Sequence, residues 1–368
     1  MARKSQTSVS GLISPSYIFS ALFCLGFFNQ WITMIMHGSL VAMLLAAWKG
    51  VAPNGAAVKS TWTGIWPIDF TLSVLSVFFG GLLNLDELPN IGPYLLLADL
   101  IFTLAICGTM TLVEDRRNRK TGSLRYPAFW QVMWGYCGAA SVLPIYSHLY
   151  VKHRLVNSPG LPRDQAQALP FTALSSVTLP LFLLLPTMLG ATPFQVSDGV
   201  VVWFLAPIAV GLFQDSVSFL ISRGGPFYRG VKNPIIVTYA IVGTASALVH
   251  LAVVAYIFSS PDLSWIKIYW PNRDAVQHGP TIIADAAMLF IQYGYPSVSL
   301  SVFALSIYAL GFDKVLAAQS LADKLQASGP LFTISALMAI GGPGAGLAWL
   351  LCGRECDTDA ANALRKKS

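Results

Sequence analysis

Charged residues are scarce in this chain. Lys, Arg, Asp and Glu make up 11% of its 368 residues, whereas a soluble domain carries roughly 25%. Hydrophobic residues account for 55%, and the mean hydropathy is +0.61. This composition excludes a disordered chain, a disulfide-rich secreted protein and an ordinary soluble enzyme, and it indicates a polytopic membrane protein. Because only 17 residues are acidic, each acid inside an apolar segment is informative.

Motifs for metals and nucleotides are also lacking. The five cysteines indicate no disulfide framework, and Cys352 and Cys356 have neither a second pair nor a nearby histidine to complete a zinc site. There is no Walker loop, dinucleotide fingerprint, Gly-x-Ser-x-Gly elbow, His-Glu-x-x-His motif or aspartate pair for a magnesium diphosphate. We therefore expect no cofactor and no metal. The net charge of +6 is attributed to basic loops at a membrane surface rather than to nucleic-acid binding.

Nine apolar segments are long enough to cross a membrane, at about 20 residues each. They cover residues 16–48, 66–84, 92–113, 127–151, 168–190, 199–221, 234–258, 281–311 and 330–352. Lipid cannot satisfy open backbone groups, so each segment must be helical. The predicted fold is all-α, a polytopic transmembrane helix bundle of eight or nine spans. It forms one integral-membrane domain over residues 1–368, with short polar tails at 1–14 and 353–368, and the first segment is interpreted as one overlong, tilted span.

Basic residues suggest an orientation. The loop at 114–126 carries five Lys and Arg residues, which predicts that this loop is cytosolic. With nine spans, the N-terminus would then lie outside and the C-terminus inside. The final residues, Arg365-Lys366-Lys367-Ser368, resemble a dilysine retrieval signal, which favours the endoplasmic reticulum; the alternative is that they are ordinary juxtamembrane basic residues.

Four acids are the candidate catalytic residues, because a charge inside hydrocarbon is costly and marks a functional site by default. Asp99 and Asp215 lie within apolar segments and cannot face lipid. Asp69 follows Trp66-Pro67-Ile68, where it could equally stabilise a helix start. Glu87 lies in the turn Asn-Leu-Asp-Glu-Leu-Pro-Asn, which is either a solvated loop or the mouth of a cavity.

Further polar and aromatic residues are candidates for substrate binding. They are Trp130, Trp134, His148, His250, Asp285, Gln292 and Tyr293. The two tryptophans share a helix face at a spacing of four residues, and such faces are usually packing but can also line a pocket that stabilises a cation. A lone histidine is more often a satisfied packing residue, and Asp285 is equally well explained as a helix-start stabiliser.

Carboxyls buried among aromatic side chains have a specific chemical use. Desolvation favours the protonated form, which can act as a general acid on an epoxide or alkene. Aromatic faces then stabilise the resulting carbocation, and a dry pocket delays attack by water. The alternatives left open are a sterol-type double-bond isomerase, which would use the same groups, and a small-molecule transporter or receptor without enzymatic activity.

Three stretches carry a resemblance to a known family. The sequence WPIDFTLSVLSVFFGGLLNLDELP, the aromatic span YPAFWQVMWGYCGAASVLPIYSHLYV and the segment FIQYGYPS resemble fungal integral-membrane terpene cyclases of meroterpenoid biosynthesis, of the ascochlorin and ascofuranone type. The resemblance implies a proton-initiated cyclisation of an epoxidised prenyl chain. Asp69 and the turn containing Asp86 and Glu87 match the acidic positions of that pattern, whereas Gly294 stands where an acid is expected. The implied partners are a lipophilic prenylated substrate and membrane lipid, with no obligate protein partner.

Overall fold

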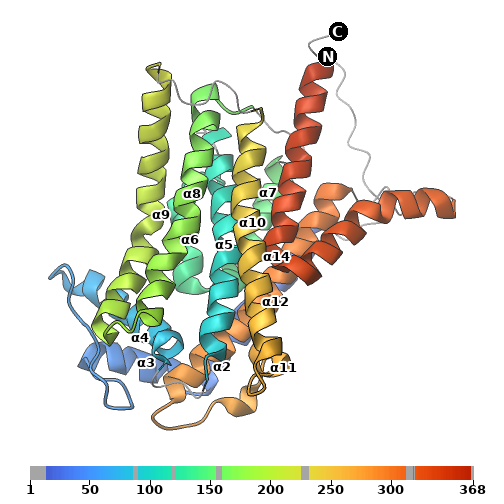
Figure 1. Cartoon of the computed structure of the whole chain (residues 1–368). Helices are drawn as coiled ribbons and strands as arrows, with labels where there is room; N and C mark the ends of the chain where they lie inside the picture. Colours follow the sequence, from blue (N-terminus) through green and yellow to red (C-terminus); the bar gives the residue numbers. More distant parts are fainter. Residues whose placement is uncertain are drawn as a thin grey trace.

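The fold is a bundle of helices, shown in a computed structural model (Figure 1). The structure describes residues 14–85, 90–117, 122–154, 160–224, 232–311, 318 and 320–365. Within these ranges the chain is helical apart from loops and one isolated bridge between Val51 and Ala57. The all-α prediction is therefore confirmed.

The helices follow one another with short connections. They are α1 (Pro15–Phe27), the π-helical turn η1 (Phe28–Ile32), α2 (Thr33–Met36), α3 (Ser39–Lys49), α4 (Trp66–Leu83), α5 (Gly92–Arg117), α6 (Pro127–Cys137), α7 (Ala139–Arg154), α8 (Arg163–Met188), α9 (Pro193–Ser222), α10 (Pro234–Ser259), α11 (Trp265–Tyr269), the 3-10 turn η3 (Arg273–Ala275), α12 (Ile282–Leu310) and α14 (Leu321–Arg365). Among the described residues, eight helices are long and apolar enough to cross a membrane. They correspond to eight of the nine predicted segments.

Helix α5 is the central element of the bundle. Nearly all of its residues are buried, and it packs against α4, α6, α8, α10, α12 and α14. A helix that is apolar around its whole circumference is stable only when neighbours cover it on every side. The predicted third span ends at residue 113, but α5 continues to Arg117 because its last four residues, all charged, are buried against neighbouring helices.

The first apolar segment is not one overlong span, so that interpretation was wrong. The helix that begins at Pro15 passes through the π-helical turn and ends at Met36. Gly38 then adopts a φ of +71°, a left-handed conformation that stops a helix. The rest of the segment forms the separate short helix α3.

The segment 127–151 is a helical hairpin rather than a span. The rings of Trp130 and Tyr146 lie 5.3 Å apart between centroids, although a continuous helix would separate these residues by about 24 Å. The chain reverses at Gly138, whose φ is +86° and whose added Cβ would lie 2.8 Å from Phe290 Cζ. Both ends of the α6–α7 hairpin are therefore at the same end of the bundle.

Helix α14 is also broken. Gly342 has a φ of 82° and a ψ of 166° within it, and Figure 1 shows two arms that diverge from this bend. Ile334 and Met338, on the first arm, lie against Gly346 on the second. The predicted ninth span is therefore a bent element.

The orientation of α1 differs from the prediction. Gly26 lies against Ala140, and the Phe19 ring faces His148, so α1 runs antiparallel to α7. Pro15 thus lies at the bundle end where α5 and α7 finish, on the same side as the basic loop after α5. The prediction that the start of the first span and this loop lie on opposite sides was wrong, because α4, which lies between them in the chain, has both ends on one side: Trp62 before it contacts Asp198 near the start of α9, and Gly81 near its end lies against Ala284 at the start of α12. Lys366 lies outside the described residues.

Replacing Gly26 with Ala tests this packing of α1 on α7. The new Cβ would lie 2.3 Å from the main-chain oxygen of Ala140, and overpacking of this kind costs typically about 1–3 kcal/mol. We expect a lower thermal unfolding temperature of the detergent-solubilised protein. The matched control is Gly353→Ala, since no atom lies within 4 Å of an added Cβ there. Equal stability of the two variants would contradict the antiparallel arrangement.

Candidate active site

A buried acid–base cluster forms where α5, α10, α11 and α12 meet. It consists of Asp99, His250, Tyr269 and Tyr295. Asp99 is 0% exposed, and its Oδ2 lies 2.8 Å from His250 Nδ1 and accepts a hydrogen bond of 2.7 Å from the Tyr269 hydroxyl. The Tyr295 hydroxyl lies 3.2 Å from His250 Nδ1. Asp99 and His250 were separate candidates in the sequence, and the fold brings them together.

Tyr269 is held in place by a neighbouring candidate. Gln292 Nε2 donates to the main-chain oxygens of Lys267 and Ile268 at 2.8 and 3.2 Å, which fastens the short helix α11 to α12. Burial and then the Asp99 carboxylate raise the pKa of Tyr269 well above its usual value. Its hydroxyl therefore stays protonated and remains a donor to Asp99. Gln292 thus positions the cluster through the backbone.

The backbone of Gly342 supports the other side of the cluster. A Cβ at this position would lie 2.9 Å from His250 Cγ, and the left-handed φ also requires glycine. The bend in α14 therefore fixes the His250 ring beside the carboxylate. Asp99 Oδ1 has no hydrogen-bond partner within the described residues. Leaving a buried acceptor unpaired costs about 1–3 kcal/mol, so a proton on this oxygen is favoured.

A second buried group, the charged cluster, lies at the other end of α5. Glu114 forms ion pairs with Arg154 Nε at 2.6 Å and with Arg117 Nε at 3.4 Å. Arg117 also pairs with Glu355, and Arg354 donates to the main-chain oxygen of Arg154 at 3.2 Å. These contacts connect α5, α7 and α14. Both acids of the charged cluster, Glu114 and Glu355, are paired with arginines, which gives it the character of a structural connection.

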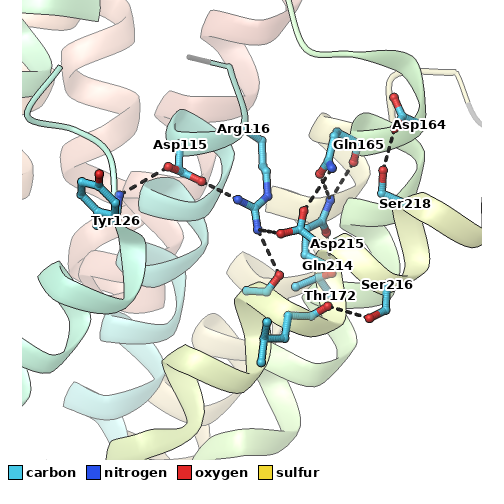
Figure 2. Close-up of polar contacts among 12 residues, drawn as sticks. Asp115, Arg116, Tyr126, Asp164, Gln165, Thr172, Gln214, Asp215, Ser216 and Ser218 are labelled. Carbon is cyan, nitrogen blue, oxygen red and sulfur yellow. Dashed lines mark hydrogen bonds and ion pairs between the residues drawn. The ribbon is translucent and has the colours of Figure 1, made fainter. Parts of the chain in front are cut away.

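Asp215 belongs to this polar end of the bundle (Figure 2). Its two oxygens face Arg116 Nη2 and Gln165 Nε2, both at 3.2 Å, and Arg116 also pairs with Asp115. The Asp215 side chain is 45% exposed, so it is not enclosed as its position within an apolar segment suggested. Arg116 and Asp99 are 17 residues apart on α5, about 25 Å along the helix axis. Asp215 therefore lies far from the acid–base cluster.

Asp69 closes the loop that precedes α4. Its Oδ1 accepts from the main-chain N–H groups of Trp62 and Thr63 and from the Thr63 hydroxyl, and its Oδ2 accepts from the N–H of Gly64, at 2.8–3.1 Å. The carboxylate also borders a cavity of about 550 Å³. Three aromatic side chains line the same cavity: Trp48, Trp66 and Phe70. Both oxygens of Asp69 are thus occupied by loop contacts.

The predicted aromatic and histidine candidates on the α6–α7 hairpin are dispersed. Trp130 donates through Nε1 to the main-chain oxygen of Ser123 at 3.1 Å. Trp134 lines a small cavity of about 60 Å³ between α5, α6, α8 and α9. His148 lies beside the Phe19 ring, with centroids 6.3 Å apart. None of these three residues contacts the acid–base cluster in the contacts described.

The last candidates lie near the start of α12. Asp285 accepts from the Thr281 hydroxyl at 2.9 Å, which agrees with a helix-start stabiliser. The Tyr293 hydroxyl accepts from Arg273 Nε at 2.6 Å. Glu87 lies outside the described residues. Within the described ranges, no group of three or more His, Cys, Asp or Glu residues is arranged to hold a metal ion.

Sequence reasoning missed several residues that the fold places in these sites. Tyr269 lies between two predicted spans, and Tyr295 was noted only as part of the segment FIQYGYPS. Glu114 was assigned to a solvated charged break. The available signal was its position directly after an apolar run, beside two arginines that could neutralise it.

Comparisons with known proteins point to one family. The CtvD domain model matches residues 15–356. The protein named terpene cyclase DEP1 of Alternaria brassicicola is 30% identical over 241 residues, which cover 63% of this chain and 64% of that protein. The protein of the same name of Fusarium langsethiae is 26% identical over 246 residues, which cover 64% and 67%. The match to the first relative thus spans less than two thirds of its length. No solved structure matches.

Substituting Glu114 by Gln tests the structural role of the charged cluster. The change leaves Arg154 and Arg117 buried without their shared carboxylate, and breaking a buried ion pair in this way costs about 3–5 kcal/mol. We expect a large loss of thermal stability in detergent. Asp262→Asn, at an exposed loop position, is the control and should leave stability unchanged. A Glu114→Gln variant as stable as this control would show that the cluster is not a structural connection.

Proposed function

Because the chain belongs to the CtvD-domain family, we propose that it is a membrane-bound terpene cyclase acting on a prenylated, lipophilic substrate. Two relatives bear the name terpene cyclase, and eight apolar helices suit an enzyme whose substrate partitions into lipid. The proposed setting is meroterpenoid biosynthesis at the endoplasmic reticulum. The observation that carries the chemistry is the buried acid–base cluster with its one unpartnered carboxyl oxygen.

Asp99 is the proposed proton donor. Its Oδ1 has no hydrogen-bond partner among the described residues, whereas the oxygens of Asp69 and Asp215 are engaged by loop N–H groups and by Arg116. A general acid must carry a proton on an atom that can reach the reacting group. Tyr269 donates to the other oxygen and so orients the carboxyl, and His250 is the neighbouring group that can hold a second proton.

The proposed reaction balances as an isomerisation. Asp99 delivers its proton to an epoxide oxygen, and the adjacent C–O bond breaks to leave a hydroxyl and a carbocation. The electron pair of a neighbouring prenyl double bond closes the ring by forming a C–C bond. The final cation loses a proton from carbon, which restores the protonated acid–base cluster. No oxidant or reductant is consumed, and the absence of a cofactor stays a prediction.

Replacing Asp99 by Asn tests the proposal. Microsomes containing the protein are supplied with an epoxyfarnesyl phenol, and cyclised product is measured by mass spectrometry. Loss of a general acid typically lowers the rate by about 10²- to 10⁴-fold, so we expect a loss of this size while expression is retained. Asp262→Asn is the matched control for removal of one carboxylate.

Other outcomes separate the alternatives. Full activity of the Asp99→Asn variant would overturn the assignment of the donor but not the class. Conversion of a sterol double bond without ring formation would favour an isomerase. Saturable solute uptake with no product from any prenylated substrate would contradict an enzymatic role altogether.

A further inference from the structure

An aromatic cavity separate from the acid–base cluster lies between the π-helical turn, α3, α4, α6 and α12. Its volume is about 240 Å³. Its lining includes the side chains of Trp31, Met43, Val74, Phe78, Tyr136 and Phe290. We refer to this space as the tail cavity. No charged side chain lines it, and none of these residues was a candidate in the sequence.

The walls of the tail cavity are fixed by specific contacts. The Trp31 and Phe290 rings meet edge to face with centroids 5.7 Å apart, and Phe78 meets Phe290 in the same way at 5.1 Å. Trp31 Nε1 donates to the main-chain oxygen of Cys137 at 2.7 Å, just before the tip of the α6–α7 hairpin. Edge-to-face pairs and a satisfied indole N–H indicate a preformed space rather than loose packing.

We propose that the tail cavity binds a hydrocarbon segment of the substrate, an isoprenoid tail, and selects its length. This inference rests on the proposed function. Pockets for whole drug-sized ligands measure roughly 300–1,000 Å³, so a space of about 240 Å³ accommodates only part of one. Its apolar lining suits the part without polar groups, because a buried polar group without a partner is costly.

The tail cavity is accessible from the outer surface of the bundle. Leu44 on α3 and Tyr136 on α6 both line it, and each is 38% exposed. Both residues lie in apolar helical segments, so the surface they border faces lipid. A prenylated substrate dissolved in the bilayer therefore has a lateral route into the cavity.

Helix α12 connects the tail cavity with the acid–base cluster. Phe290 lines the cavity, and Tyr295 belongs to the cluster five residues later. This spacing corresponds to about 7–8 Å along the helix axis. A prenyl chain is long enough to place one end in the cavity while another part approaches Asp99. The cavity and the cluster are therefore neighbours along α12, on faces about 140° apart around its axis.

Two substitutions with opposite effects on cavity size test the inference. Val74→Phe fills the tail cavity, and we expect KM for a farnesyl phenol epoxide to rise at least tenfold while a geranyl analogue is affected less. Phe78→Ala enlarges it and should weaken the preference between geranyl, farnesyl and geranylgeranyl analogues. Phe332→Ala is the control, because Phe332 is 77% exposed on the first arm of α14. Unchanged tail-length selectivity in both cavity variants would overturn the inference.

Labelling keeps the test independent of turnover and of misfolding in a variant. The wild-type protein in microsomes is irradiated with a farnesyl phenol that carries a diazirine at the tail end. We expect the label on peptides containing Met34 or Met43, which line the cavity, and competition by unlabelled farnesyl phenol. Such labelling without cyclisation would refute the proposed function and support the tail site. Competable labelling confined to other segments, or no labelling, would overturn the tail site whether or not product forms.

Discussion

Inside hydrocarbon every polar group must find its partner within the protein, and this constraint governs the structure. The cost of an unpaired charge or an open backbone group is several kcal/mol in lipid. Helix α5 shows both consequences. At one end it carries four consecutive charged residues that are buried and paired with one another or with other helices, and near the other end it carries Asp99, which is paired on one oxygen only.

The degree of pairing separates structural carboxyls from chemical ones. Asp69 accepts four hydrogen bonds from its loop, and Glu114 faces two arginines. Carboxylates satisfied in this way are stabilised as anions and have no vacant position for a reacting group. Asp99 differs because the Tyr269 hydroxyl and His250 Nδ1 both contact its Oδ2. Its Oδ1 has no partner in the described part of the chain. Position within an apolar segment identified the candidate acids in the sequence. Only the hydrogen-bond partners in the structure distinguish the acid that has an unpaired oxygen from those that are fully paired.

The sequence predicted the helices far better than their breaks. Eight of the nine apolar segments correspond to long helices because length and hydropathy are properties of the segment itself. Gly138 looked like an ordinary glycine in an apolar run, since its left-handed conformation depends on contact with Phe290, which is remote in sequence. The pairing of Asp99 with His250, 151 residues apart, was equally beyond local patterns. Charges after residue 113 predicted a loop because their partners, Arg154 and Glu355, belong to later helices.

Two of the three glycine breaks that the sequence did not reveal lie beside the acid–base cluster and the tail cavity. Gly138, at the tip of the α6–α7 hairpin, touches Phe290 at the wall of the tail cavity, and Gly342, at the bend of α14, touches His250 in the acid–base cluster. Non-helical backbone at membrane depth is tolerated only where protein surrounds it or a cavity adjoins it. Both bends meet this condition. Because glycine has no Cβ, its backbone packs directly against the ring of Phe290 at Gly138 and of His250 at Gly342. One arm of each element ends at the charged cluster, where Arg154 at the end of α7 and Arg354 and Glu355 on the second arm of α14 contact one another or α5. The charged cluster therefore fixes the far end of α7 and of the second arm of α14, whose bends lie beside the site, although the cluster itself is about 25 Å from Asp99 along α5.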